Sequence, residues 1–206
     1  MGVDGAERLA ELAEEKGVAF VDAPVLGTRK PAEEAKLVVL ASGPDDALDR
    51  CEPVFDVIGQ AMRRLGPVPN GSKLKMVTNL WLLAVTEGAA EAIALAEGLD
   101  LDPREFLATM EGSQIDTPYL HLKGEAMLER KLEPSFKLKL AEKDASLVLE
   151  AADRAGAETG SRARCARPSS AASSSATATR TWPPSTLPPA APRIREFTDA
   201  AHRGDP

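Results

Sequence analysis

The chain has 206 residues, of which 43% are hydrophobic, 28% charged and 4% aromatic, and its formal net charge is −7 at pH 7. An acidic balance of this size argues against a nucleic-acid partner. The two cysteines, Cys51 and Cys165, are too few for a disulfide framework, so we expect a reducing, cytoplasmic location. No run of 18 apolar residues and no signal-like start is present, and His121 and His202 have no partner at metal-ligand spacing. We therefore expect no membrane association and no metal site.

Helices and strands alternate over the first 70 residues. Apolar spacing and turn residues predict, in chain order, a helix over 5–15, strands over 18–24 and 36–43, a helix over 45–59 and a short strand from Ala61. This order is typical of the second half of an α/β sheet whose beginning is absent. We expect residues 1–70 to form one α/β region.

The pattern becomes helical from Gly71 onward. Almost thirty residues without proline, from Gly71 to Leu99, predict one long helix of about 40 Å. This helix is apolar on too many sides to have one solvent face, so we expect it to be buried against another subunit or domain. Asp102 and the proline after it supply the start of a further helix, and two more helices are expected before residue 157.

The expected fold class is therefore α/β followed by all-α, with a helical domain over 71–160 and a tail over 161–206. The tail differs in composition from the rest of the chain: it holds seven Arg, no Lys, seven Ser and seven of the 16 prolines. Such a segment cannot bury enough apolar surface to offset its ordering entropy. Its composition predicts disorder.

The first candidate site is the run DAPVLGTRKPAEEAKL, which starts at Asp22. Its loop leaves the carboxyl end of an expected strand, where ligands bind in open α/β sheets, and its glycine allows backbone N–H groups to approach an anion closely. An ordinary strand-to-helix turn has the same composition, so the motif alone does not define a site. The loop residues are Val25, Leu26, Gly27 and Thr28.

The second candidate site is at the start of the long helix. Lys75 and Asn79 are four residues apart and share one face of the helix. The helix dipole and partial burial would both lower the pKa of the Lys75 ammonium group, so that it could exchange a proton near neutral pH. Asn79 could hold a hydroxyl or carboxylate oxygen of a substrate. The alternative is that Lys73 and Lys75 are both solvated.

The third candidate site is FKLKLAEKDASL, which places Lys143 and Asp144 within a helix. Lys137, Lys139 and Lys143 could reach a phosphate or an amide of a cofactor. A run of charges of this kind is more often a solvated helix face.

In order and spacing, these three motifs resemble the β-hydroxyacid dehydrogenases, the family that includes 3-hydroxyisobutyrate dehydrogenase and glyoxylate/succinic semialdehyde reductases. That family carries a DAPVSGG-type substrate loop, a G-x-x-x-K-x-x-x-N helix with the catalytic lysine, and a late F-x-L-x-L-x-x-K-D segment at the cofactor. The resemblance runs from about residue 4 to residue 158. It implies an oxidoreductase that transfers a hydride between NAD or NADP and a small β-hydroxy acid or its aldehyde.

The resemblance also implies a role for each motif. Lys75 would be the catalytic acid/base and Asn79 its orienting partner, Val25, Leu26, Gly27 and Thr28 would bind the substrate carboxylate, and Phe136 and Lys143 would contact the cofactor. Residues 1–70 would be part of a Rossmann-like NAD(P)-binding domain, and 71–160 a helical domain through which we expect a homodimer. Leu26 and Thr28 replace the Ser and second Gly of the family loop, so the substrate need not be the usual one. Pro69 stands where a Gly is common before the helix.

Two features depart from the family pattern at the ends of the chain. The sequence contains no G-x-G-x-x-G, the turn that cradles a dinucleotide pyrophosphate, so we expect the chain to lack about a hundred amino-terminal residues and to bind NAD(P) poorly by itself. One coding for Ser173–Thr186, translated one nucleotide earlier, gives VELGHGDEDMAAVY, which resembles the family's last helix. We hypothesise that the tail is an out-of-frame peptide.

Two other functions remain open from the sequence. One is a non-catalytic helical fragment whose long helix pairs with a partner subunit. The other is a relative of 6-phosphogluconate dehydrogenase, which shares the architecture and an active-site lysine; the absence of a phosphate-clamping basic cluster at the loop ranks it lower. Imine reductases, a related group, generally lack the lysine, so Lys75 argues against them.

Overall fold

The structure is a computed structural model that describes residues 2–130 and 138–157. All of these residues fall within one of the chain's two compact units, Met1–Ser169. Phe136, Cys165 and the whole of the tail lie outside the described residues, so the expectations about them stay predictions. The domain boundaries at residues 70 and 160 also stay predictions.

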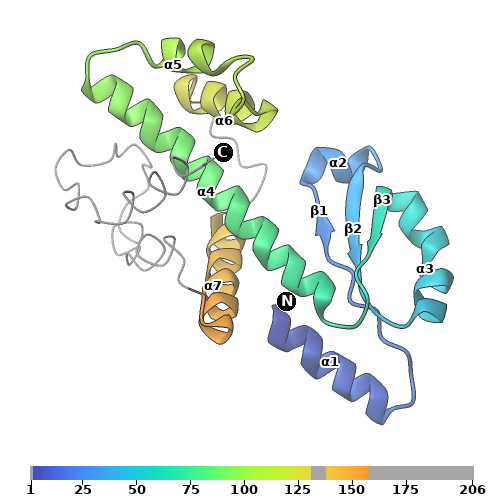
Figure 1. Cartoon of the computed structure of the whole chain (residues 1–206). Coiled ribbons are helices and arrows are strands. Elements are labelled where there is room, and N and C mark those ends of the chain that lie inside the picture. Colours follow the sequence, from blue (N-terminus) through green and yellow to red (C-terminus); the bar gives the residue numbers. More distant parts are fainter. Residues whose placement is uncertain (1, 131–137, 158–206) are drawn as a thin grey trace, which may run out of the picture. The chain divides into compact units, whose positions relative to one another are not determined.

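The amino-terminal part is a small sheet with helices around it (Figure 1). Its elements are α1 (Val3–Glu15), β1 (Val25–Leu26), α2 (Arg29–Glu33), β2 (Leu37–Ala41), α3 (Asp45–Ile58) and β3 (Gly59–Arg64). The strands lie in the order β1-β2-β3. β1 runs antiparallel to β2, with Val25 opposite Val39, and β2 runs parallel to β3. The predicted helices over 5–15 and 45–59 and the strand over 36–43 are confirmed.

The strand predicted over 18–24 is wrong. In the described chain this segment makes only an isolated antiparallel bridge, Asp22 to Ser42, and the strand itself lies later, at Val25 and Leu26. A strand needs a hydrogen-bonding partner as well as β-forming residues, and here the ladder to β2 begins only after Pro24. Val25 and Leu26 are therefore strand residues rather than loop residues, and the turn proper begins at Gly27.

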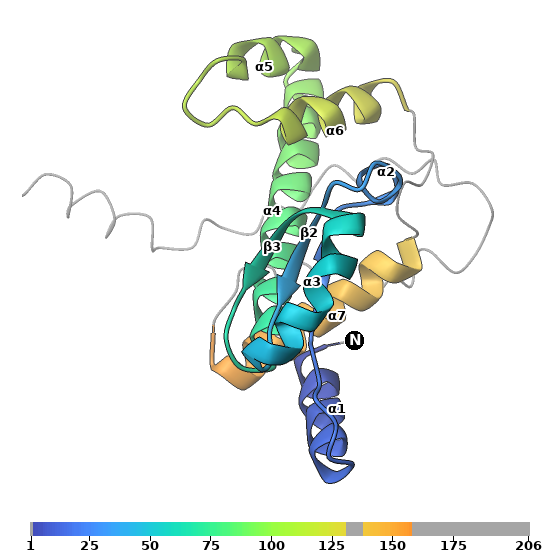
Figure 2. The same cartoon turned by 90° about the vertical axis from the view of Figure 1, so that its right-hand side faces the viewer.

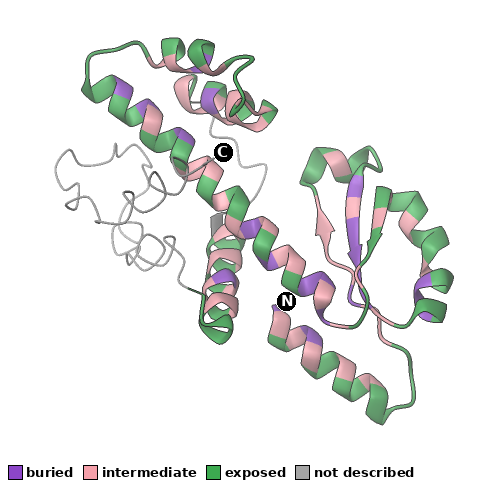
Figure 3. Cartoon of the chain, in the orientation of Figure 1, coloured by how far each residue is buried: buried purple, intermediate pink, exposed green. Residues whose placement is uncertain are grey.

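The core of the sheet is built around β2. Val39 and Ala41 on this strand and Leu48 on α3 are fully buried, and the sequence of β2 is apolar throughout, as expected for a central strand covered on both faces. Both α3 and the long helix α4 (Asn70–Gly98) contact β2. Figure 2 shows α3 in front of the sheet with α4 behind it, and Figure 3 shows β2 as the most completely buried strand.

The remaining described elements are helices packed on α4. They are α5 (Pro103–Met110), α6 (Pro118–Leu128) and α7 (Leu138–Ala155). Asp102 caps α5 as predicted, since its carboxylate accepts a hydrogen bond from the Arg104 N–H at 2.9 Å. Thr117 caps α6 in the same way, through the Leu120 N–H at 3.1 Å. The α/β followed by all-α fold class is confirmed.

Burial along α4 is uneven. One set of positions, including Met76, Ala89 and Ile93, is buried, while Trp81 remains 68% exposed. Among the described residues, α4 is the one helix long and apolar enough to cross a membrane by length and composition alone, a test that core helices of non-membrane proteins also pass.

Candidate active site

Lys75 projects from the second turn of α4 toward β1. Its Nζ donates a hydrogen bond to the Val25 carbonyl oxygen at 2.8 Å, which joins positions 50 residues apart in the chain. The side chain is half-buried, and this loss of water is the largest cause of a lowered Lys75 pKa. Lys143 lowers the pKa further by repulsion, while Asp144 opposes the shift by attraction. The predicted direction of the pKa shift thus has burial as its main cause.

Asn79 lies one turn further along α4 and is only 6% exposed. Its Nδ2 donates to Asp144 Oδ2 at 3.4 Å, and Lys143 Nζ lies 3.4 Å from Asp144 Oδ1. The second and third sequence motifs therefore meet in space. Asn79 is tied to α7 through Asp144, and its predicted role beside Lys75 stays a prediction.

The turn after β1 borders this cluster. Gly27 has φ +132°, and a Cβ at this position would lie 2.6 Å from Leu37 Cδ2, so the turn requires a glycine. Gly27 and Thr28 are exposed, whereas Val25 and Leu26 are half-buried in the sheet. The turn is thus open to solvent next to the residue that holds the Lys75 amine.

A buried group at the start of α4 was not assigned a role from the sequence. Asp22 is 3% exposed, and its carboxylate accepts hydrogen bonds from the Ser72 N–H at 2.7 Å and the Ser72 hydroxyl at 2.8 Å. The Ser42 hydroxyl donates to the same carboxylate at 3.2 Å and accepts from the Gly71 N–H at 2.9 Å. The signal that could have found this group is the absence of a capping side chain at Pro69, just before the helix.

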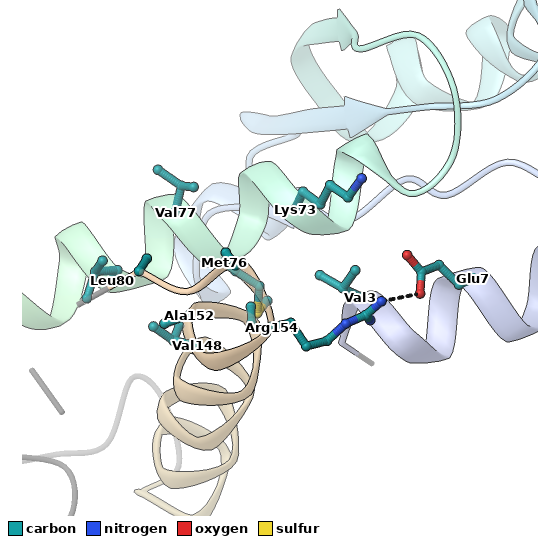
Figure 4. Close-up of a pocket in the computed structure, with 12 residues that line it drawn as sticks. Val3, Glu7, Lys73, Met76, Val77, Leu80, Val148, Ala152 and Arg154 are labelled. Carbon is teal, nitrogen blue, oxygen red and sulfur yellow. Dashed lines mark hydrogen bonds and ion pairs between the residues drawn. The ribbon is translucent and has the colours of Figure 1, made fainter. Parts of the chain in front are cut away.

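Lys73 and Lys75 belong to different surroundings. Lys73 is one of the residues that line an apolar pocket of about 490 Å³ between α1, α4 and α7, as are Met76 and Val148 (Figure 4). On the rim of this pocket Arg154 pairs with Asp4 and Glu7, which ties α7 to α1. Of the two lysines, only Lys75 reaches β1.

Metal-ligating side chains do not gather in the described part of the chain. No group of three or more His, Cys, Asp or Glu side chains has a metal-binding arrangement there. His121 is instead paired with Asp116, whose Oδ1 lies 2.7 Å from the ring Nε2.

The sequence matches two models of known protein families. Residues 1–66 match the model described as the NAD binding domain of 6-phosphogluconate dehydrogenase, and residues 70–181 match the model described as NAD-binding of NADP-dependent 3-hydroxyisobutyrate dehydrogenase. A Rossmann-like NAD-binding part followed by a helical domain defines a class of NAD(P)-dependent oxidoreductases. Within that class, the chain belongs to the β-hydroxyacid dehydrogenase family.

Individual relatives agree with this family. Glyoxylate/succinic semialdehyde reductase 1 of Arabidopsis thaliana is 33% identical over 138 residues, which are 67% of this chain and 48% of that protein. The chloroplastic reductase 2 of the same plant is 31% identical over 145 residues, or 70% of this chain and 40% of that protein. The structure of Mycobacterium tuberculosis 3-hydroxyisobutyrate dehydrogenase with L-serine superposes with a TM-score of 0.73 at 26% identity, over 80% of this chain and 59% of that one. The chain thus spans about half the length of the curated relatives it matches.

Proposed function

We propose that this chain carries the lysine-bearing half of the active site of an NAD(P)-dependent oxidoreductase that acts on a small β-hydroxy acid or its aldehyde. The proposal rests on the surroundings of the Lys75 amine. The amine is half-buried, its pKa is lowered, and it donates a hydrogen bond to the Val25 carbonyl beside a solvent-exposed turn. A lysine whose pKa lies closer to neutral can both accept and return a proton at physiological pH.

A bound nicotinamide cofactor would supply the chemistry of hydride transfer to and from the substrate carbon. In the oxidative direction the neutral Lys75 amine would accept the proton from the hydroxyl oxygen on the carbon that loses the hydride. In the reductive direction the Lys75 ammonium returns that proton to the carbonyl oxygen. Asp144 stabilises the ammonium form by attraction, and Lys143 favours the neutral amine.

Among the described residues, those around Lys75 fit the reactive end of a nicotinamide cofactor. Lys143 on α7 is half-exposed, and its Nζ lies 3.4 Å from Asp144 Oδ1. Its ammonium group could donate a hydrogen bond to the nicotinamide amide. No G-x-G-x-x-G turn exists in the sequence to hold the pyrophosphate. We therefore propose that Lys143 contacts the cofactor and that the pyrophosphate is held by residues outside this chain.

We further propose that the turn after β1 receives the substrate carboxylate. Glyoxylate, succinic semialdehyde and 3-hydroxyisobutyrate, the compounds in the relatives' names, are all small carboxylates with an aldehyde or hydroxyl group. Gly27 and Thr28 are the exposed residues next to Lys75's anchoring carbonyl. Leu26 and Thr28 differ from the family loop, which would shift the preference among such acids.

A second candidate function is that of a 6-phosphogluconate dehydrogenase, because residues 1–66 match the model of that enzyme's NAD binding domain. A phosphorylated substrate needs free cations at the substrate turn. Arg29 and Lys30 follow the turn, but Arg29 pairs with Glu33 at 2.7 Å and Lys30 lies 3.9 Å from Glu34, both on the exposed helix α2. These pairs favour an unphosphorylated substrate.

The proposed function is tested with Lys75→Ala and Lys73→Ala in a chimera that joins this chain to the amino-terminal dinucleotide-binding half of a reductase relative. Nicotinamide absorbance is followed with glyoxylate and with succinic semialdehyde. Because general acid–base catalysis contributes about 10²–10⁴-fold, we expect Lys75→Ala to lower kcat by at least about 100-fold and Lys73→Ala to change it less than about threefold. Similar kcat values for the two variants would contradict the role given to Lys75.

We also propose a homodimer formed through the helical domain and a cytoplasmic location. The dimer is supported by the exposed apolar side chains of α4, and the location by a composition with only two cysteines.

A further inference from the structure

Two contacts join the same two segments of the chain. Asp22 contacts Ser72, and three residues later on both segments Val25 contacts Lys75. The first contact is buried and made by three hydrogen-bonding groups, whereas the second holds the end of a flexible four-carbon side chain. The position of the Lys75 amine therefore depends on how firmly the first turn of α4 is held near Asp22.

The first turn of α4 has no local side-chain cap. Pro69 precedes the helix and offers no capping side chain, so the first N–H groups need acceptors from elsewhere. The Gly71 N–H bonds to the Ser42 hydroxyl, and the Ser72 N–H bonds to the Asp22 carboxylate. Asp22 and Ser42 are themselves joined by a pair of backbone hydrogen bonds at 2.8 and 2.9 Å. A carboxylate at this helix end is also favoured by the helix dipole.

The same turn lies directly on the sheet backbone. A Cβ at Gly71 would collide with the Leu40 carbonyl oxygen and would lie 2.8 Å from the Asp22 carbonyl oxygen. The helix start therefore approaches β2 and the Asp22 segment as closely as backbone atoms allow. Losing the Asp22 carboxylate would leave the buried Ser72 N–H and hydroxyl groups without their acceptor, which favours a shift of the helix start away from this segment.

We infer that Asp22 is a positioning residue for Lys75: its buried carboxylate holds the first turn of α4 against the segment that carries Val25, and so determines where the lysine amine lies. This inference rests on the proposed role of Lys75. Asp22 touches neither substrate nor cofactor and acts through the helix. Its effect on Lys75 is separate from that of Asp144 and Lys143, which face the amine from α7.

The inference is tested on this chain without any cofactor, by the pH dependence of amine acylation at single lysines, measured by peptide mass spectrometry. Lys73 is the internal reference because it is exposed and two residues away on the same helix. In the unaltered chain we expect the acylation midpoint of Lys75 to lie below that of Lys73. The difference between the two midpoints is called the gap below. In Asp22→Ala the acylation midpoint of Lys75 should rise and reduce the gap by at least about half, because the amine regains water.

Three further variants make the result specific. Asp22→Asn keeps an oxygen for the Ser72 N–H and should restore most of the gap. Leu107→Val, a matched change at a buried residue of α5 that lies against Gly124 of α6, should leave the gap unchanged even though it lowers stability. Ser72→Ala removes one hydrogen bond to the carboxylate and should give a smaller upward shift, which serves as the test if Asp22→Ala does not fold.

Two outcomes would overturn the inference: an unchanged gap in folded Asp22→Ala or in Ser72→Ala, or an equal shift in Leu107→Val. Loss of the proposed function is distinguishable, because it would appear as turnover that does not depend on Lys75 while the acylation midpoints behaved as expected.

Discussion

At the scale of single residues, the burial of Lys75 has a cost in stability. An ammonium group that loses water without a carboxylate in direct contact is destabilised relative to the unfolded chain, and the hydrogen bond to the Val25 carbonyl offsets only part of this. Such a cost is common where a group must be ready to exchange a proton.

The cost predicts a pH dependence of stability. Since the Lys75 pKa is lowered in the folded chain, the unfolded chain holds more protons between the folded pKa and the model value of 10.5, and the free energy of unfolding gains a contribution that rises with pH in that window. Lys75→Met abolishes this contribution. We expect the original chain to gain stability relative to Lys75→Met as the pH is raised from about 7 to about 10.

Urea unfolding of both proteins at the two pH values provides the measurement. Lys73→Met, the same change at an exposed lysine two residues away on α4, is the control. If the difference in free energy of unfolding between the original chain and Lys75→Met stayed constant with pH, the Lys75 pKa would not be lowered in the folded chain.

At the scale of elements, the close contact between α4 and the sheet depends on a glycine, Gly71, which has no side chain. Gly71 lies against backbone oxygens of Leu40 and Asp22, and backbone atoms cannot move aside as a flexible side chain can. Gly98, the last residue of the same helix, has no atom within 4 Å of the position that a Cβ would occupy.

These two glycines form a matched pair. Gly71→Ala should lower the free energy of unfolding by about 1–3 kcal/mol or more, because it overpacks a rigid contact. Gly98→Ala should leave it unchanged or raise it by up to about 1 kcal/mol, because alanine favours helix. Urea unfolding followed by circular dichroism measures both. Equal effects at the two positions would mean that α4 does not approach the sheet this closely.

At the scale of the whole molecule, α4 presents an exposed apolar stripe. Val77 and Trp81 are 62% and 68% exposed, and the small residues Ala84 and Gly88 continue the same face at spacings of three and four residues. Large side chains followed by small ones allow two helices to cross closely, and contiguous exposed apolar surface favours association. A second copy of this chain, packed with its α4 across this stripe, is the partner that we expect.

The stripe predicts self-association that one substitution should weaken. Trp81→Glu places a charge at the centre of the stripe and should shift the dimer toward monomer in sedimentation or light scattering over a concentration series. Val57→Glu, at a 72% exposed position on α3, is the control and should not change association. A monomer at about 100 μM in the original chain, well above the dissociation constants of stable dimers, would refute the proposal.

Local sequence patterns predict much of the secondary structure of this protein. The extent of α4, the helix over 45–59, the central strand and the caps at Asp102 follow from apolar periodicity and from residues that favour helix starts. The four-residue spacing of Lys75 and Asn79 also places both on one helix face, since covalent geometry sets that relation within a helix. The motifs on these elements carried the family resemblance.

The partners of those residues were decided by packing. Lys75 meets a carbonyl 50 positions earlier, Asn79 meets a carboxylate 65 positions later, and Asp22 meets Ser72 across 50 residues. The strand lies at Val25 and Leu26 and not over 18–24, because the hydrogen-bonded ladder to β2 starts there. Periodicity shows which face of an element is apolar, but not which element covers it. The lowered pKa of Lys75 and its anchorage through Asp22 therefore exist only in the folded chain, where segments distant in sequence remove water from the same amine.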